Sequence, residues 1–427
     1  MLKREIKRWG LVLIMINGII GAGIFGLPSR IFAISGIYSI PIIFLCALLI
    51  FVFIMIYAEV GTQFKETGGS YLYTLKAFGE LPGFVIGWIG FVGRIVVYAA
   101  LINLLLDYLS FLNDSFTEQS TRTISILLIT AFLFIINYSG VKNSSKLINI
   151  LSISKVIPLL FFIIAGFFFI DIDLIDFSKS PIPTISEFSS TIFILIFAFT
   201  GFGVALMNTG EISNPKKDIP FAMITTSIFV TIFYVLIQIV AVGTFPDLAS
   251  SNKPIADAAN SFFGPMGGLI ITIGAIISIG GTLNGSILVG SRTPFALSEK
   301  NQFPKIFSKI HPKTAVPHIS LWGYSIIVIL VSISGTFIYL LSISVICTIL
   351  VYFTISASLI KLRMQNKNEN TGFKLKYGNS IAILGMLICI WLLSVADLSK
   401  LVDVFITIGA GIIIYFIFKI SNEQNNS

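Results

Sequence analysis

Two apolar segments of this chain are interrupted by glycine clusters whose exposed backbone could bind a charged ligand. The first runs from Asn17 to Pro28 and reads NGIIGAGIFGLP, and the second runs from Phe197 to Gly203 and reads FAFTGFG. A glycine inside a helix costs about 1 kcal/mol relative to alanine, so clustered glycine predicts local unwinding of each helix. Close packing through small residues is the alternative explanation for either cluster taken alone.

An unwound stretch within a spanning helix exposes both kinds of backbone group. One half-helix ends and leaves carbonyl oxygens, and the other begins and leaves N–H groups at the positive end of its dipole. Such carbonyls can hold an ammonium and such N–H groups a carboxylate, and an α-amino acid carries both on neighbouring atoms. Paired breaks at matching positions indicate a substrate site near the middle of the bilayer.

The elements that would position these breaks are membrane-spanning helices. The chain has 427 residues, of which 56% are hydrophobic and 11% charged, and apolar runs recur along its length. Apolar runs of about 18 residues or more are typical of helices that span a bilayer, where every backbone polar group must be paired internally. We expect about twelve spans, at 10–34, 37–61, 83–110, 122–140, 148–170, 190–212, 220–244, 266–290, 319–336, 338–361, 380–396 and 400–420.

The two breaks fall in the first and sixth of these spans, and this spacing predicts an internal repeat. Five-helix repeats over 10–170 and 190–361 would have opposite topology and would place both breaks at matching positions. Helices 11 and 12, at 380–420, would follow. The predicted fold class is therefore an all-α polytopic membrane protein, a single transmembrane domain over 1–427 with a 5+5 inverted repeat and two C-terminal helices.

The distribution of charge predicts how the chain sits in the membrane. Lysine and arginine gather in the loops on the side of the N-terminus, for example Lys216 and Lys305, and most acids lie in the opposite loops, for example Asp171 and Asp247. The positive-inside rule then places both termini in the cytoplasm, at the inner membrane of a bacterial cell. The net charge of +8 is explained by this asymmetry, and no nucleic-acid partner is expected because the basic residues are scattered over short loops.

The motifs and their order resemble those of the amino acid/polyamine/organocation (APC) permeases. The resemblance rests on Gly18 to Phe25, on Ala58-Glu59-Val60 with Gly68 to Tyr71, on Phe197 to Gly203 with Glu211 and Asn214 to Pro220, and on Arg292 to Pro304. It covers nearly the whole chain. It implies the LeuT-like inverted-repeat fold that these permeases share with sodium-coupled symporters, and an amino-acid substrate.

The resemblance also implies roles for residues at the breaks. The Ile19 carbonyl would receive the substrate ammonium together with the carbonyls of Phe197 and Thr200, and the Ala22 and Gly23 amides would hold the carboxylate. The Phe197 ring would form an aromatic lid over the bound substrate. The expected substrate-binding residues are Ile19, Gly21, Ala22, Gly23, Phe197, Thr200, Gly201, Gly203 and Asn284.

Four ionisable residues lie in or near predicted spans. A charged side chain within the bilayer costs free energy, so such a residue is by default a candidate functional residue. Lys155, in span five, matches the lysine that some proton-coupled relatives carry where sodium-coupled relatives bind sodium. Burial disfavours the charged form of a lysine, so Lys155 could carry the coupling proton, the alternative being snorkelling to the cytoplasmic surface. Arg94 lies near mid-depth in span three. Glu59 and Glu211 are gating or electrostatic candidates, with structural pairing or helix capping as the alternative.

Arg94 and Lys155 also predict the substrate class. Related arginine exchangers have an uncharged polar residue at the position matching Arg94 and a carboxylate at the position matching Gly203. A cationic side chain bound beside Arg94, with no mid-span acid nearby, would be repelled. We therefore expect neutral or acidic amino acids, with a proton, or alternatively sodium, as the coupling ion.

Other classes of protein lack support in the sequence. An enzyme would need catalytic groups, but the histidines are His311 and His318, and the cysteines Cys46, Cys347 and Cys389 have no disulfide or metal spacing. An amino-acid sensor usually carries an appended signalling domain, and a channel needs symmetric elements or charged rings. We expect a transporter without cofactor or metal, and the main alternative is an exchanger, which needs no coupling cation.

Overall fold

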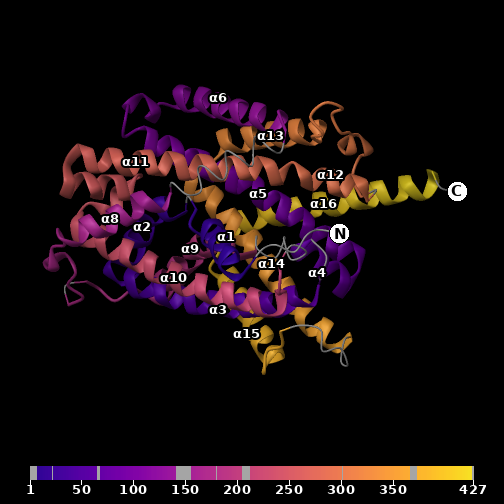
Figure 1. Ribbon diagram of the computed structural model, residues 1–427, viewed down its shortest axis with the longest axis horizontal. Helices are drawn as coiled ribbons and strands as arrows, with labels where there is room; N and C mark the ends of the chain where they lie inside the picture. Colours follow the sequence, from indigo (N-terminus) through magenta and orange to yellow (C-terminus); the bar gives the residue numbers. More distant parts are fainter. Residues whose placement is uncertain are drawn as a thin grey trace.

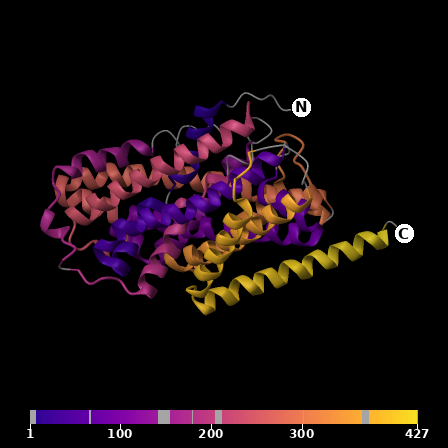
Figure 2. The same ribbon diagram turned by 90° about the horizontal axis from the view of Figure 1, so that it is seen from below.

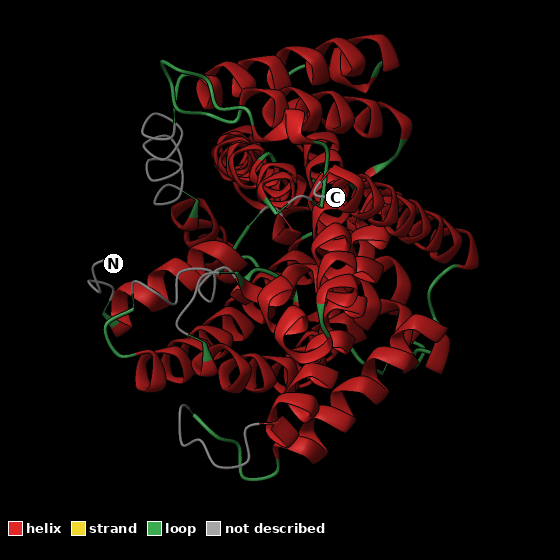
Figure 3. Ribbon diagram, turned by 90° about the vertical axis from the view of Figure 1, so that its right-hand side faces the viewer, coloured by secondary structure: helices red, strands yellow, loops and turns green. Residues whose placement is uncertain are grey.

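The computed structural model describes residues 7–21, 23–64, 68–140, 155–178, 180–203, 212–300, 302–365 and 373–425. Its helices pack in one bundle, and Figure 3 shows that the described residues contain helices and loops without strands. The helices of the N-terminal part are α1 (Arg8–Ile19), α2 (Gly23–Ser35), α3 (Ser39–Gln63), α4 (Gly69–Phe78), α5 (Glu80–Leu109), α6 (Gln119–Tyr138) and α8 (Val156–Phe167). The later helices are α9 (Ile185–Phe199), α10 (Pro215–Thr244), α11 (Pro254–Gly290), α12 (Arg292–Glu299), α13 (His318–Ser334), α14 (Phe337–Gln365), α15 (Gly378–Ser394) and α16 (Leu398–Asn425).

The predicted all-α polytopic class is confirmed. Seven helical stretches in the described part of the chain are long and apolar enough to cross a membrane, and five further apolar helices have 10–17 residues. Two of these shorter helices, α1 and α9, end at the glycine clusters, as expected for interrupted spans. The start of predicted span five lies outside the described residues, and the division into repeats at 10–170 and 190–361 remains a prediction.

Helix α5 occupies the middle of the bundle. It packs against α4, α11, α13, α14 and α16, and it is the most buried of the long apolar helices (Figure 1). By contrast, α6 and α16 are the least buried of these helices. Figure 2 shows α16 along the outer edge of the bundle, with its C-terminal part extending beyond its neighbours. Large apolar side chains on α6 and α16, such as Leu128 and Phe405, are exposed and suit contact with lipid.

Two helical features differ from the expected spans. Helix α4 lies between predicted spans two and three, and begins at Gly69, whose φ of 54° is in the region that favours glycine. Helix α11 begins at Pro254, well before the expected span 266–290, and changes direction at Gly264, where φ is 67°. The Gly264-Pro265 pair explains this kink, because proline cannot continue the preceding hydrogen-bond ladder.

Candidate functional site

The two glycine-rich breaks cross in the middle of the bundle. Helix α1 ends at Ile19 and α2 begins at Gly23, while α9 ends at Phe199. A Cβ placed on Gly201 would lie 2.3 Å from the Gly18 carbonyl oxygen, and Gly201 has a φ of 110°. Glycine is required there for two independent reasons: the left-handed conformation and the close backbone approach.

The Phe197 ring packs against the first turn of α2. A Cβ on Gly23 would lie 3.0 Å from two carbons of that ring, and the Phe197 side chain is buried. The structure thus places the expected lid residue directly on the half-helix whose first N–H groups are the expected carboxylate ligands. Ala22 lies outside the described residues.

Tyr234, on α10, joins the two breaks. Its hydroxyl oxygen lies 3.1 Å from the Ile19 carbonyl oxygen and 3.0 Å from that of Ala198. The Ile19 carbonyl also accepts a hydrogen bond of 2.7 Å from the Gly21 N–H. Because a hydroxyl has one proton, Tyr234 bonds the two carbonyls alternately or shares its proton between them. Sequence reasoning missed Tyr234, since a tyrosine within an apolar run carries no local signal of this contact.

At the second break, the carbonyl of Phe197 is also hydrogen-bonded to nearby protein donors. The Phe197 carbonyl accepts hydrogen bonds from the Thr200 N–H (3.2 Å) and from the Thr200 hydroxyl (2.7 Å). Two of the expected ammonium ligands, the carbonyls of Ile19 and Phe197, are therefore bonded to nearby protein donors in this structure. An arriving ammonium would have to replace those donors.

Lys155 lies beside the first break. Its side chain is buried, with 5% of its surface exposed, and its ammonium donates a hydrogen bond to the Asn17 carbonyl near the end of α1. Burial of this kind does not fit the snorkelling alternative, in which the ammonium reaches the membrane surface.

The last two expected substrate-binding residues are Asn284, on α11, and Gly203, at the end of the second glycine-rich segment. The Asn284 side chain, on α11, is fully buried and accepts a hydrogen bond of 2.8 Å from the Asn137 amide. Two residues earlier on α11, the Thr282 hydroxyl oxygen lies 3.9 Å from the position of a Cβ on Gly21. A Cβ on Gly203 would lie 3.7 Å from the Tyr57 ring, which is an ordinary contact.

Glu59 does not lie at the breaks but holds three segments together at one end of the bundle. Its carboxylate forms a two-pronged ion pair with Arg363 of α14, at 2.6 and 2.7 Å, and accepts the Leu375 N–H at 2.8 Å. Arg363 also donates to the Leu375 carbonyl. The geometry matches the structural-pairing alternative for Glu59, and Glu211 lies outside the described residues.

Arg94 is half-buried in the middle of α5, away from the residues that form the breaks. Its carbonyl oxygen accepts a hydrogen bond of 3.3 Å from the Tyr324 hydroxyl. Its side chain lines a cavity between α4, α5, α11 and α12. No group of three or more histidine, cysteine or acidic residues that could hold a metal occurs in the part of the chain that the structure describes.

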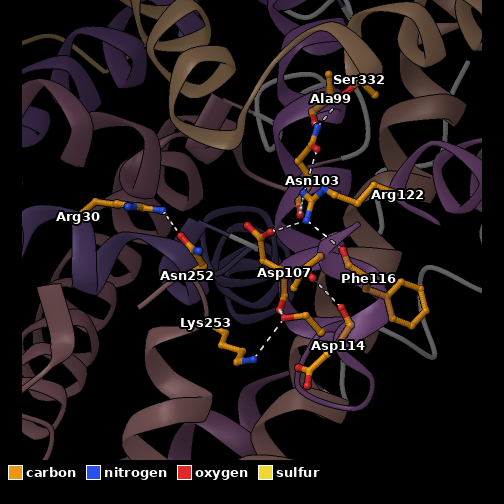
Figure 4. Close-up of polar contacts among 12 residues, drawn as sticks. Arg30, Ala99, Asn103, Asp107, Asp114, Phe116, Arg122, Asn252, Lys253 and Ser332 are labelled. Carbon is orange, nitrogen blue, oxygen red and sulfur yellow. Dashed lines mark hydrogen bonds and ion pairs between the residues drawn. The ribbon is translucent and has the colours of Figure 1, made fainter. Parts of the chain in front are cut away.

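A polar network joins α5 and α6 near the C-terminal end of α5 (Figure 4). Arg122 donates to the Asp107 carboxylate at 2.8 Å and to the carbonyl and side-chain oxygens of Asn103 at 3.1 Å, joining α6 to α5. Arg30, on α2, donates to Asn252 at 2.5 Å, in the segment before α11.

The two half-helices around the first break have different neighbours. Helix α2 packs against α9, against the short 3-10 helix η5 (Leu248–Ser250) and against α11, whereas α1 packs mainly against α10. The first half is therefore held mainly by α10, and the second mainly by α9, η5 and α11.

A bundle of spanning helices with two crossing breaks and a buried lysine beside them defines a polytopic membrane transporter, and comparisons with known proteins identify its family. A model of the amino acid permease family matches residues 6–420, so the chain belongs to that family, within the APC superfamily. The chain is 31% identical over 332 residues to the serine/threonine exchanger SteT of Bacillus subtilis, covering 75% of this chain and 74% of that protein. It is 26% identical over 448 residues to the branched-chain amino acid permease BcaP (100% and 95% covered) and 26% identical over 452 residues to the glutamate/serine transporter AimA (98% and 82%), both from the same organism.

The expected family is thus confirmed, and with it the general function. The chain is an integral membrane transporter of amino acids and not an enzyme.

Proposed function

We propose that this chain is a proton-coupled importer of neutral amino acids that works by alternating access, with both termini in the cytoplasm at the bacterial inner membrane. The observation that carries the proposal is the crossing of the two breaks, where Gly201 meets the Gly18 carbonyl. Backbone groups at such breaks suit the ammonium and carboxylate of an α-amino acid. Relatives named for serine, threonine and branched-chain amino acids support neutral substrates.

The substrate would replace hydrogen bonds that protein groups make at the two breaks. Its ammonium would take the Ile19 and Phe197 carbonyls from Tyr234 and Thr200, while the amides of Ala22 and Gly23 would hold its carboxylate. Because the ammonium replaces one hydrogen-bond donor by another, few polar groups are left unpaired at any step. This keeps the free-energy barrier to substrate binding low in a buried site. The Phe197 ring would then cover the substrate.

Lys155 would carry the coupling proton. Its hydrogen bond to the Asn17 carbonyl is charge-assisted when the lysine is protonated and weaker when it is neutral. Gain or loss of the proton would therefore change how firmly α1 is held, and α1 is the half-helix that packs mainly against α10. Lys155, a cation beside the first break, would disfavour arginine and lysine as substrates.

The test uses purified protein in liposomes with an imposed pH gradient and labelled amino acids outside. Concentrative uptake into empty liposomes that collapses with a protonophore is the expected result. An exchanger is the second candidate, favoured by the similarity to SteT. Uptake only into preloaded liposomes, indifferent to the protonophore, would establish exchange and reduce Lys155 to a structural residue. Inhibition of uptake by arginine, at concentrations where leucine fails to inhibit, would refute the substrate class.

A further inference from the structure

The segment that joins α12 to α13, residues 302–317, presents positive and apolar side chains together. No acidic residue occurs within it. Its exposed side chains include three lysines and two isoleucines that alternate along the chain: Lys305, Ile306, Lys309, Ile310 and Lys313. None of the three lysines forms an ion pair with a residue that the structure describes. We call the surface formed by these five side chains the basic surface.

The other side of this segment is anchored to the bundle by aromatic rings. The Phe307 ring packs against α13, where a Cβ on Gly323 would lie 3.1 Å from it, and the Phe307 carbonyl accepts a hydrogen bond of 2.9 Å from the Ser320 hydroxyl. The centre of the Phe303 ring lies 4.9 Å from that of Phe307 and 6.3 Å from that of Trp88 on α5. These contacts hold the segment in place and leave the basic surface exposed.

The segment adjoins the part of the bundle that suits contact with lipid. The centre of the His311 ring lies 5.2 Å from that of Tyr138, at the end of α6, and Figure 1 shows the segment at the rim of the bundle beside α13. One turn before Tyr138, Phe134 contacts Trp322 of α13 at 4.3 Å between ring centres. Trp322 and the neighbouring Ile135 of α6 are exposed. Because tryptophan and tyrosine are enriched where hydrocarbon meets the headgroups, we infer that the basic surface lies at headgroup level.

The composition of the basic surface indicates what covers it. Clusters of lysine beside a spanning helix are attracted to anionic headgroups. Exposed isoleucine gains free energy by entering the boundary between headgroups and acyl chains. A soluble acidic partner or an inorganic anion could pair with the lysines, but neither explains two exposed isoleucines beside the lipid-facing side of α6 and α13.

We propose that the basic surface binds the anionic headgroups of phospholipids in the surrounding membrane, with Ile306 and Ile310 inserted beneath them. Bound lipid anchors the segment, and with it the ends of α12 and α13, at the membrane surface. The proposed orientation of the chain puts this contact in the cytoplasmic leaflet. The contact itself requires neither an amino acid nor a proton gradient.

The experiment measures which lipid lies next to the basic surface. A fluorophore is attached to an Ile310→Cys variant, in which the three native cysteines are buried and do not compete for the label. The labelled protein is placed in vesicles of phosphatidylcholine and phosphatidylglycerol, with bromine on the acyl chains of one lipid or the other. Bromine quenches the label by contact, so the two series give the ratio of phosphatidylglycerol to phosphatidylcholine binding at this position.

Matched pairs of lysine substitutions test the charge. Lys305→Gln with Lys309→Gln removes two lysines of the basic surface. Lys374→Gln with Lys376→Gln is the control, because it removes two exposed lysines from the segment before α15. All four side chains are exposed, so both variants should fold.

We expect quenching by both lipids in the protein with its lysines intact, and a binding ratio that favours phosphatidylglycerol. The ratio should fall by about fivefold for each lysine removed from the basic surface, and the control should leave it unchanged. A label that neither lipid quenches would show that the segment faces water, and would overturn the proposal. A ratio near that of the bulk lipid mixture, or one that the control lowers as much as the test variant, would overturn it as well.

This outcome is independent of the proposed function, since no transport is measured. Anionic lipid at the basic surface stands even if the chain proves to be an exchanger. Equally, proton-coupled uptake stands if the label shows no preference for anionic lipid.

Discussion

Replacing Gly201 by alanine should force the two helix breaks apart. Gly201 has a φ of 110°, and its added Cβ would lie 2.3 Å from the Gly18 carbonyl oxygen. A side chain in this backbone conformation costs about 1–3 kcal/mol, and overpacking of a close contact costs about 1–3 kcal/mol more. Together we expect a loss of roughly 2–6 kcal/mol in the free energy of unfolding.

The measurement is SDS-induced unfolding of the purified protein in detergent micelles, followed by circular dichroism, with amino-acid uptake in liposomes as a second readout. Gly203→Ala is the matched control from the same turn, because its Cβ would make an ordinary contact at 3.7 Å from the Tyr57 ring. We expect the control to unfold within about 1 kcal/mol of the wild type. Equal stability of the Gly201→Ala variant and the wild type would refute the close crossing of the breaks.

Three further predictions concern contacts that hold the helices in place, each measured by the same unfolding assay. Glu59→Gln should cost about 3–5 kcal/mol, because it leaves the largely buried Arg363 without its partner, and a loss below about 1 kcal/mol would contradict the pairing. Tyr234→Phe should cost about 1 kcal/mol and lower uptake, since two carbonyls at the breaks lose their shared donor; unchanged uptake would show that this donor is dispensable. Arg122→Gln should lower the free energy of unfolding by about 1–2 kcal/mol, because Asp107 loses its ion-pair partner. A loss as large as that of Glu59→Gln would contradict the argument that a more buried ion pair costs more to break.

The positions of the breaks could be predicted from sequence because their cause is local. Clustered glycine disfavours a helix wherever it occurs, and the structure ends α1 and α9 within these clusters. The long apolar helices could equally be predicted from the lengths of the apolar runs. Helix α4 was missed because it is too short and too polar to resemble a span.

The partners of individual side chains could not be predicted in this way, because they come from distant parts of the chain. Tyr234 reaches carbonyls that precede it by 215 and 36 positions. Glu59 pairs with a residue 304 positions away, so the sequence left its gating and structural explanations both open. The position of Lys155 came from a family resemblance, and its contact with Asn17 is a result of packing.

The surroundings of Arg94 also could not be predicted from the sequence. Arg94 was expected near mid-depth and near the substrate, and the structure places it in a space shared with α12 and α4 instead of at the breaks. Arg292 and Lys300 come from a segment that the sequence marked only as a family motif. Their convergence on one cavity depends on the packing of α4 and α11 against α5 and of α12 against α11.

The most direct test of the central claim is amino-acid-driven proton entry into liposomes that contain the wild-type protein or the Lys155→Gln variant. A pH-sensitive dye trapped inside reports protons that enter when a neutral amino acid is added outside. We predict acidification with the wild type, and none with Lys155→Gln even where the variant still binds the amino acid in detergent. Acidification by the variant at the wild-type rate would show that Lys155 does not carry the proton. If the wild type transports the amino acid without acidifying the liposomes, proton coupling itself is contradicted.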